Sequence, residues 1–238
     1  MDGDTAGDRA EPKRPSPRVR AAAAVMGVAV LAAGVWGLGK VLRNAPGDGA
    51  PAECSATDGH LPARYVSGAR LCAALNRQDL PDLLRTPAER TVTAGGRREW
   101  VTPDGGMKVA DCEAHVALES YSVKLSASYD ASSVAGRAAF ETGSAQKRTV
   151  LGHPAVLYSD RTASITLDGE KAGTGRGGHA RRLMVAMDEK DRGDSFEIVI
   201  WRQDGRAPDD TALLRVAEKV LPTVPGWSAG DEEPQADV

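Results

Sequence analysis

The stretch DCEAHVALESYSVKLSASY, residues 111–129, decides the fold class, because apolar and polar side chains alternate along it. Apolar residues share one face from Cys112 to Leu118, and again from Tyr121 to Tyr129. A period of two is typical of a β-strand with one buried face. Since the phase slips at Glu119-Ser120, we expect one long antiparallel strand with a bulge or break there.

Further strand candidates follow this stretch, and turn residues separate them. Two turn signals favour hairpins over crossover helices: the pair Ser159-Asp160 and the cluster 191–194. The sequence therefore predicts a mainly antiparallel sheet of about five strands. The candidates after residue 129 are Val150-Leu151 with Ala155–Tyr158 around the turn Gly152-His153-Pro154, then 163–167, 183–187 and 196–200.

Helices are expected on both sides of the strand region, which makes the fold class α+β. Leu71 and Leu75 have helical spacing, and Asp79 resembles the N-cap of a second short helix. A third short helix is expected over 132–140. The strongest pattern starts at Pro208-Asp209-Asp210 and ends at Pro222, with apolar residues at helical spacing between them. The sequences Ala94-Gly95-Gly96 and Pro103–Gly106 predict turns around a small strand at 99–101.

The apolar run AAAAVMGVAVLAAGVWGLG, residues 21–39, carries no charged side chain. As a helix it would be about 28 Å long, close to the ~30 Å hydrocarbon core of a bilayer. We therefore expect a transmembrane helix over residues 21–42. A cleaved secretory signal peptide is the alternative, because Ala50-Pro51-Ala52 has the small-x-small form of a cleavage site.

The predicted span divides the chain into five parts. Basic residues crowd just before it, at Lys13, Arg14, Arg18 and Arg20, so the positive-inside bias places the N-terminus in the cytoplasm and the large domain outside the cell membrane. Residues 1–20 are expected to be a disordered cytoplasmic tail and 43–53 a linker. Residues 54–228 form the predicted extracytoplasmic domain, and 229–238 a disordered acidic tail.

Three cysteines follow the span, on the side where disulfides form. A bridge between Cys54 and Cys72 would pin the linker to the domain, and we favour this pair. Because three cysteines cannot all pair, one thiol is left over. Cys112 is then either a buried thiol or an alternative disulfide partner.

The sequence offers no recognisable catalytic residue, cofactor site or metal site. His60 and His179 are expected in loops, and His153 on the solvent side of a Gly-x-Pro turn. Asp111, Glu113 and His115 would share a strand face, which we interpret as a solvated polar face. The segment Gly169–Gly178 opens no helix, so it is expected to be a mobile hairpin loop and not a phosphate cradle.

Composition excludes one class of partner. The net charge is −3 and aromatic residues make up 4% of the chain, so neither a basic stripe nor a stacking platform for bases is present. Nucleic acid is therefore not an expected partner.

Two segments carry a resemblance to known proteins: Arg148–Tyr158, with the sequence RTVLGHPAVLY, and Leu213–Pro222. With them the chain resembles uncharacterised single-pass membrane proteins of Streptomyces and related actinobacteria. More distantly it is similar to secreted lipoprotein domains of the PsbP/Mog1 type. The resemblance implies an envelope location and an antiparallel sheet flanked by helices, and it brings no catalytic residues.

These observations predict a non-enzymatic binding or interaction module, tethered to the bilayer through residues 21–42. Its expected partner is an envelope protein or a small apolar ligand. The alternatives are a secreted domain released by signal cleavage, and an envelope hydrolase whose site is assembled from distant loops.

Overall fold

The computed structural model describes residues 51–102, 108–138, 145–168 and 171–227. They form an α+β fold around one mixed sheet of eight strands, in the order β1-β2-β3-β4-β8-β7-β6-β5. The strand β1 runs parallel to β2, and every other neighbouring pair is antiparallel. The strands are β1 (Cys54–Asp58), β2 (Thr93–Val101), β3 (Val109–Ala117), β4 (Tyr121–Ser128), β5 (Gln146–Val150), β6 (His153–Asp168), β7 (Lys171–Ala186) and β8 (Ser195–Arg202).

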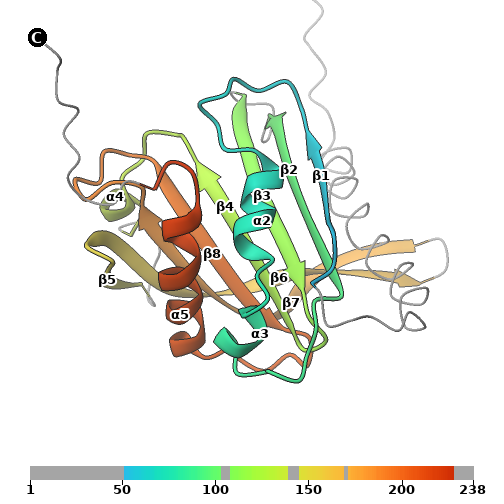
Figure 1. Ribbon diagram of the computed structural model, residues 1–238. Helices are drawn as coiled ribbons and strands as arrows, with labels where there is room; N and C mark the ends of the chain where they lie inside the picture. Colours follow the sequence, from blue (N-terminus) through green and yellow to red (C-terminus); the bar gives the residue numbers. More distant parts are fainter. Residues whose placement is uncertain (1–50, 103–107, 139–144, 169–170, 228–238) are drawn as a thin grey trace, which may run out of the picture.

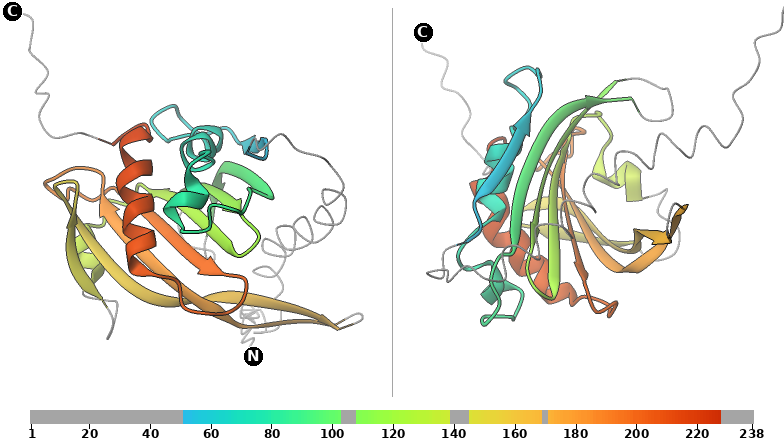
Figure 2. Two further views of the ribbon diagram at one scale, coloured as in Figure 1. Left: turned by 60° about the horizontal axis from the view of Figure 1, so that its bottom comes forward. Right: turned by 90° about the vertical axis from the view of Figure 1, so that its right-hand side faces the viewer.

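Helices cover one face of the sheet (Figure 1). They are α2 (Gly68–Leu75), α3 (Leu80–Leu83) and α5 (Asp210–Val220), which is followed by the 3₁₀ helix η3 (Leu221–Thr223). The short helix α4 (Val134–Ala138) lies on the opposite face, and Figure 2 shows how strongly the sheet curves between the two layers. Val134 packs there with Val156 and Met184, while the main core lies under α2 and α5.

The helix predictions are confirmed in outline. The N-cap of α2 is Ser67, whose side chain accepts a hydrogen bond from the Arg70 amide. The N-cap of α5 is Asp209, which accepts from the Thr211 amide, and the apolar face of α5 is fully buried. The third predicted helix, over 132–140, begins at Val134 and is described as far as Ala138; residues 139 and 140 lie outside the described part of the chain.

The expectation of about five strands is wrong, and residues 111–129 are one source of the error. They form not one long strand but the antiparallel hairpin β3–β4, in which Val116 faces Val123. The amide of Leu118 donates a hydrogen bond to the Tyr121 carbonyl and closes the turn. Because the chain reverses there, the phase slip at Glu119-Ser120 keeps both apolar faces on the same side of the sheet.

A second source of error is the pair β6 and β7. The predicted turn at Ser159-Asp160 is continuous strand, where the two residues pair with Arg181 and Ala180. Most of the segment predicted as a mobile loop, Gly169–Gly178, is also strand from Lys171 onward. The two strands run past β5 and β8 and project from the sheet as an arm (Figure 2). The register shifts between Arg161 and Ala163, where the arm leaves the sheet.

The predicted turn at Ala94-Gly95-Gly96 is also wrong, because these residues lie inside β2. Gly96 meets Gly68 at the start of α2. A Cβ at Gly96 would lie 2.0 Å from the Gly68 carbonyl oxygen. Here glycine serves the close approach of a helix to a strand and not a turn.

Several expectations fall outside the described residues. They concern the tail 1–20, the transmembrane helix 21–42, most of the linker 43–53, the turn Pro103–Gly106 and the acidic tail 229–238. Within the described part of the chain, no helix is long and apolar enough to cross a membrane.

Candidate functional site: an arginine-lined hollow

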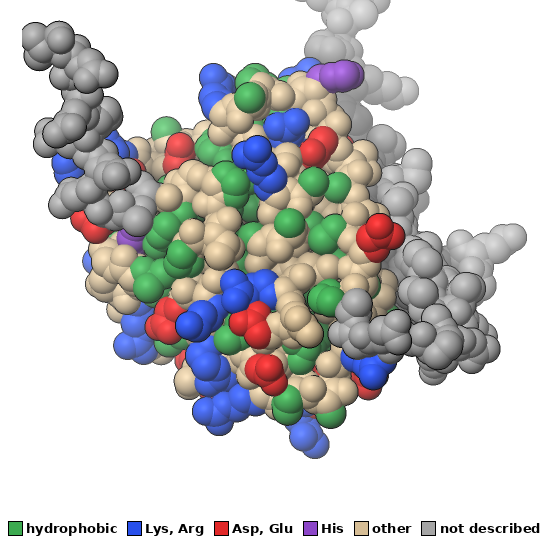
Figure 3. Space-filling view, in the orientation of Figure 1, with side chains coloured by type: hydrophobic (Ala, Val, Ile, Leu, Met, Phe, Trp, Pro, Cys, Tyr) green, Lys and Arg blue, Asp and Glu red, His purple; other side chains and the backbone are tan. Residues whose placement is uncertain are grey.

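The site with the most distinctive chemistry is a hollow at the end of the sheet where α2 begins. It has a volume of about 470 Å³. Figure 3 shows basic side chains over the upper part of this face of the molecule, and among the described residues that line the hollow none is acidic. We call it the arginine hollow. Its lining is Ala63, Arg64, Tyr65, Val66, Ser67, Arg70, Arg98, Tyr129, Pro225 and Gly226.

Arg98 is the fixed guanidinium of the arginine hollow. Its Nη1 donates to the Tyr65 carbonyl oxygen at 3.1 Å, and its Nε lies 3.9 Å from Asp58 Oδ1. The same Asp58 oxygen accepts a hydrogen bond of 2.9 Å from the Gly68 amide at the start of α2. One carboxylate therefore faces both a helix N-terminus and a guanidinium, which leaves positive charge uncompensated on this side of the hollow.

The other two guanidinium groups, of Arg64 and Arg70, form no ion pair with an acid in the described part of the chain. Arg64 Nη2 donates to the Tyr65 hydroxyl at 2.6 Å, and the Arg64 guanidinium carbon lies 4.7 Å from the centre of the Tyr65 ring. Arg70 is exposed on the first turn of α2. Among the described residues, neither Arg64 nor Arg70 forms an ion pair with a carboxylate. Both can therefore turn toward an anion without breaking an existing pair.

Aromatic rings form the apolar side of the arginine hollow. Tyr65 packs edge-on against Trp100 and Tyr129, with ring centres 5.5 and 4.9 Å away. The Tyr129 hydroxyl accepts a hydrogen bond of 3.0 Å from the Val66 amide, and burial raises the pKa of Tyr129 to about 12, so its phenol stays neutral. Trp100 lies at the edge of this cluster and is 40% exposed. Guanidinium groups beside an exposed aromatic surface suit a ligand that carries carboxylate or phosphate together with apolar groups.

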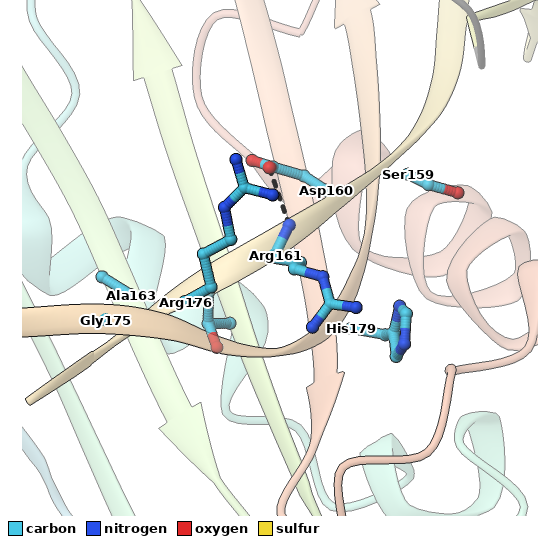
Figure 4. Close-up of a pocket in the computed structure, with 8 residues that line it drawn as sticks. Ser159, Asp160, Arg161, Ala163, Gly175, Arg176 and His179 are labelled. Atoms are coloured by element: carbon cyan, nitrogen blue, oxygen red, sulfur yellow. Dashed lines mark hydrogen bonds between the residues drawn. The ribbon is translucent and has the colours of Figure 1, made fainter.

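A second hollow, of about 610 Å³, lies along the arm formed by β6 and β7 (Figure 4). Arg161, Arg176 and His179 line it. Asp160 accepts a hydrogen bond of 2.7 Å from the Arg161 amide and also pairs with Arg182 Nε at 2.9 Å. In the described part of the chain His179 has no carboxylate partner, so no acid–base pair for catalysis is present there.

The disulfide between Cys54 and Cys72 is present, as the cysteine pattern predicts. It joins the start of β1 to the middle of α2. Cys112 is a free, buried thiol. Burial raises its pKa to about 11, so Cys112 is neither a bridge partner nor a reactive thiolate.

Asp111, Glu113 and His115 do lie on one strand face, but the acids are paired with bases and not left to water. Arg97 bonds to both carboxylates, at 2.7 Å to Asp111 and 2.8 Å to Glu113, and Lys124 reaches Glu113 at 3.2 Å. The His115 ring stacks on Trp201. Among the described residues no group of acids, histidines and cysteines could hold a metal ion.

The Glu113 carboxylate supports a prediction about pH. Burial alone would raise its pKa, but Lys124 and Arg97 outweigh burial and the net pKa is lowered from 4.5. A lowered pKa in the folded state adds stability above pH 4.5, and this stability is lost as the pH falls through the folded-state pKa. We expect Glu113→Gln to cost about 2 kcal/mol at pH 7, the range for a hydrogen bond to a charged group, and much less at pH 3.

The measurement is the free energy of unfolding in urea at both pH values. Glu99→Gln is the matched control, because Glu99 pairs with the same Arg97 but is half exposed. Burial and the neighbouring Glu113 raise the pKa of Asp111, so that residue acts in the opposite sense on the pH profile. An equal cost of Glu113→Gln at both pH values would contradict the ion-pair explanation.

His153 is not on the solvent side as predicted: it is completely buried. Its Nδ1 lies 2.9 Å from the Ala186 carbonyl oxygen, and its ring stacks on Trp227 with centres 3.9 Å apart. Its Nε2 is buried without a hydrogen-bond partner in the described part of the chain. The ring of His153 therefore packs between the end of β7 and Trp227 in the buried part of the domain.

Together these features define an α+β domain built on a mixed eight-stranded sheet, with a basic hollow at one end. The chain belongs to a family of unknown function, DUF6215, whose family model matches residues 12–144. The matched range contains the three arginines and both tyrosines of the arginine hollow, but not Pro225 and Gly226. No curated protein and no solved structure matches the chain.

Proposed function

We propose that this protein is a non-enzymatic binding module, tethered to the cell membrane, whose arginine hollow binds an acidic peptide segment of an envelope protein. The observation that supports it most directly is the meeting of Arg64, Arg70 and Arg98 at one hollow whose described lining contains no acid. A carboxylate side chain of a partner would supply the missing charge.

The charge of the hollow supports a peptide over a small apolar ligand. A pocket for a small apolar ligand buries most of that ligand in a cleft lined mainly by hydrophobic side chains. The lining here combines apolar groups with the guanidinium groups of Arg64, Arg70 and Arg98, and Trp100 offers an exposed apolar surface beside it. A chain segment that places an acidic residue in the hollow and an apolar one against Trp100 would match both features.

The envelope location is supported by the apolar run 21–39 and by the Cys54–Cys72 disulfide, which suits an oxidising compartment. We infer from the same run a retained anchor over 21–42, with the domain outside. Release as a secreted domain is the alternative, and detection of residues 1–20 on the membrane-bound protein decides between them. We also propose that the protein is of actinobacterial origin and is distantly related to lipoprotein domains of the PsbP/Mog1 type. The resemblance of the segments 148–158 and 213–222 supports both points.

The test uses poly-L-glutamate as the probe, with the full chain in detergent micelles. We expect Arg64→Gln combined with Arg70→Gln to weaken binding about tenfold, because two ion pairs worth up to ~1 kcal/mol each are lost. Arg206→Gln is the matched control, since Arg206 is 81% exposed and outside the hollow. Fluorescence anisotropy of labelled probe gives the dissociation constants.

Polyphosphate is the comparison probe. Preferential binding of polyphosphate, lost in the same double variant, would assign the hollow to a phosphate polymer and contradict the peptide proposal. If the double variant and the unchanged protein bound poly-L-glutamate equally well, the arginine hollow would not be the binding site.

A further inference from the structure

The arginine hollow lies directly beside the point where the described chain ends. Pro225 and Gly226 form part of its wall, and the described residues stop at Trp227. The sequence continues as SAGDEEPQADV, residues 228–238, with three consecutive acids at Asp231, Glu232 and Glu233. The most acidic short segment of this chain therefore follows immediately after the wall of its most basic hollow.

Two contacts fix the place where this acidic segment starts. The Trp227 ring stacks on the buried His153 ring at 3.9 Å, with Phe196 6.4 Å away. The Trp227 amide donates a hydrogen bond of 3.1 Å to the Val224 carbonyl oxygen, and Gly226 between them has a φ of +93°. The chain thus turns at Gly226 and is held by its next side chain, so the segment after Trp227 begins at a defined position.

The acids are within reach of the hollow. Asp231 to Glu233 follow Trp227 by four to six residues, which in extended form span about 13–20 Å at ~3.3 Å per residue. Such a distance covers a hollow of about 470 Å³ whose wall is the adjacent turn.

From this juxtaposition we infer that residues 231–233 occupy the arginine hollow of their own chain and compete with the acidic partner segment. The inference rests on the proposed function and adds regulation of that site. A tethered competitor acts at an effective concentration in the millimolar range, whereas a few exposed ion pairs bind only weakly. With an effective concentration of about 1 mM and a dissociation constant of about 0.1 mM for the internal segment, the apparent affinity for a partner falls about tenfold, a difference that a stronger or multivalent partner overcomes.

The test compares the full chain with the triple variant Asp231→Asn, Glu232→Gln and Glu233→Gln, which keeps the length of the tail. A variant ending at Trp227 is the second form, and Asp237→Asn outside the acidic triplet is the matched control. We expect both tail variants to bind poly-L-glutamate about tenfold more tightly than the full chain, and Asp237→Asn to bind as the full chain does. A synthetic peptide of residues 228–238 should compete with the probe on the shortened protein.

A second readout needs no probe. NMR shifts of the backbone amides of residues 63–70 and of the Trp100 indole should differ between the full chain and the triple variant. Unchanged shifts overturn the inference, whether or not poly-L-glutamate binds. If the tail variants bind the probe as the full chain does, while Arg64→Gln with Arg70→Gln still weakens binding, only the competition is wrong. If the probe binds none of the proteins, the proposed function fails. The amide shifts alone then show whether residues 231–233 occupy the arginine hollow.

Discussion

Replacing Gly96 by alanine is expected to destabilise the domain by about 3 kcal/mol or more, the upper range for overpacking a core. A Cβ at Gly96 would stand 2.0 Å from the Gly68 carbonyl oxygen and 2.5 Å from its carbonyl carbon. Both atoms are backbone, so no side-chain rotation relieves the clash. Neither element can shift easily, since β2 is paired on both sides and the Gly68 amide is bonded to Asp58.

The free energy of unfolding in urea, measured with the reducing agent omitted, checks this result. Gly178→Ala is the control, because a Cβ there meets nothing closer than 3.6 Å although the residue also lies in a strand. We expect the control to change stability by less than about 0.5 kcal/mol. Similar costs for both variants would show that the approach of α2 to β2 is not what requires glycine.

Removing the Cys54–Cys72 bridge is the second change with a large expected effect. The bridge closes a loop with a sequence separation of 18 residues. By the loop-entropy relation, a loop of this size contributes about 3 kcal/mol to the free energy of unfolding, mostly by restricting the unfolded chain. The loop contains most of β1, an edge strand whose residues are mostly exposed.

The comparison is between the unchanged protein and the double variant Cys54→Ala with Cys72→Ala, each unfolded with and without reductant. The reductant should lower the stability of the unchanged protein to near that of the double variant, and should leave the double variant unaffected. Cys112→Ala serves as the control for thiol effects, because Cys112 is buried and unpaired. If the reductant still lowered the stability of the double variant, the Cys54–Cys72 bridge would not be the source of the stabilisation.

The sequence predicts which segments pair and which faces are buried better than it predicts where strands begin and end. Alternation identified both halves of residues 111–129, and helical spacing identified α5 nearly to the residue. The same alternation cannot distinguish a bulge from a tight turn, since both change the phase. Glycine-rich and Ser-Asp segments were wrongly predicted as turns or loops, because Gly, Ser and Asp are typical turn residues and nothing local shows that the segments 94–96 and 159–160 pair with neighbouring strands.

The arginine hollow could not be found from motifs. Its arginines come from a loop, from α2 and from β2, so only the fold brings them together. One local signal was present: Arg64 and Arg70 flank the helix start near Ser67, with no acid between them. His153 was misplaced for a similar reason, since nothing near it in the sequence indicates that Trp227 covers its ring.

In the proposed tethered form of the protein, the position of the disulfide determines how tension on the chain before Cys54 would enter the domain. Cys54 is the first residue of β1, and the bridge joins it covalently to Cys72 within the fully buried part of α2. Part of a pull on the chain before Cys54 would pass through the sulfur atoms to the core helix, beside the part that β1 passes to β2. The bridge therefore relieves the backbone of residues 55–71, which contains most of β1 and most of the lining of the arginine hollow, of part of that load.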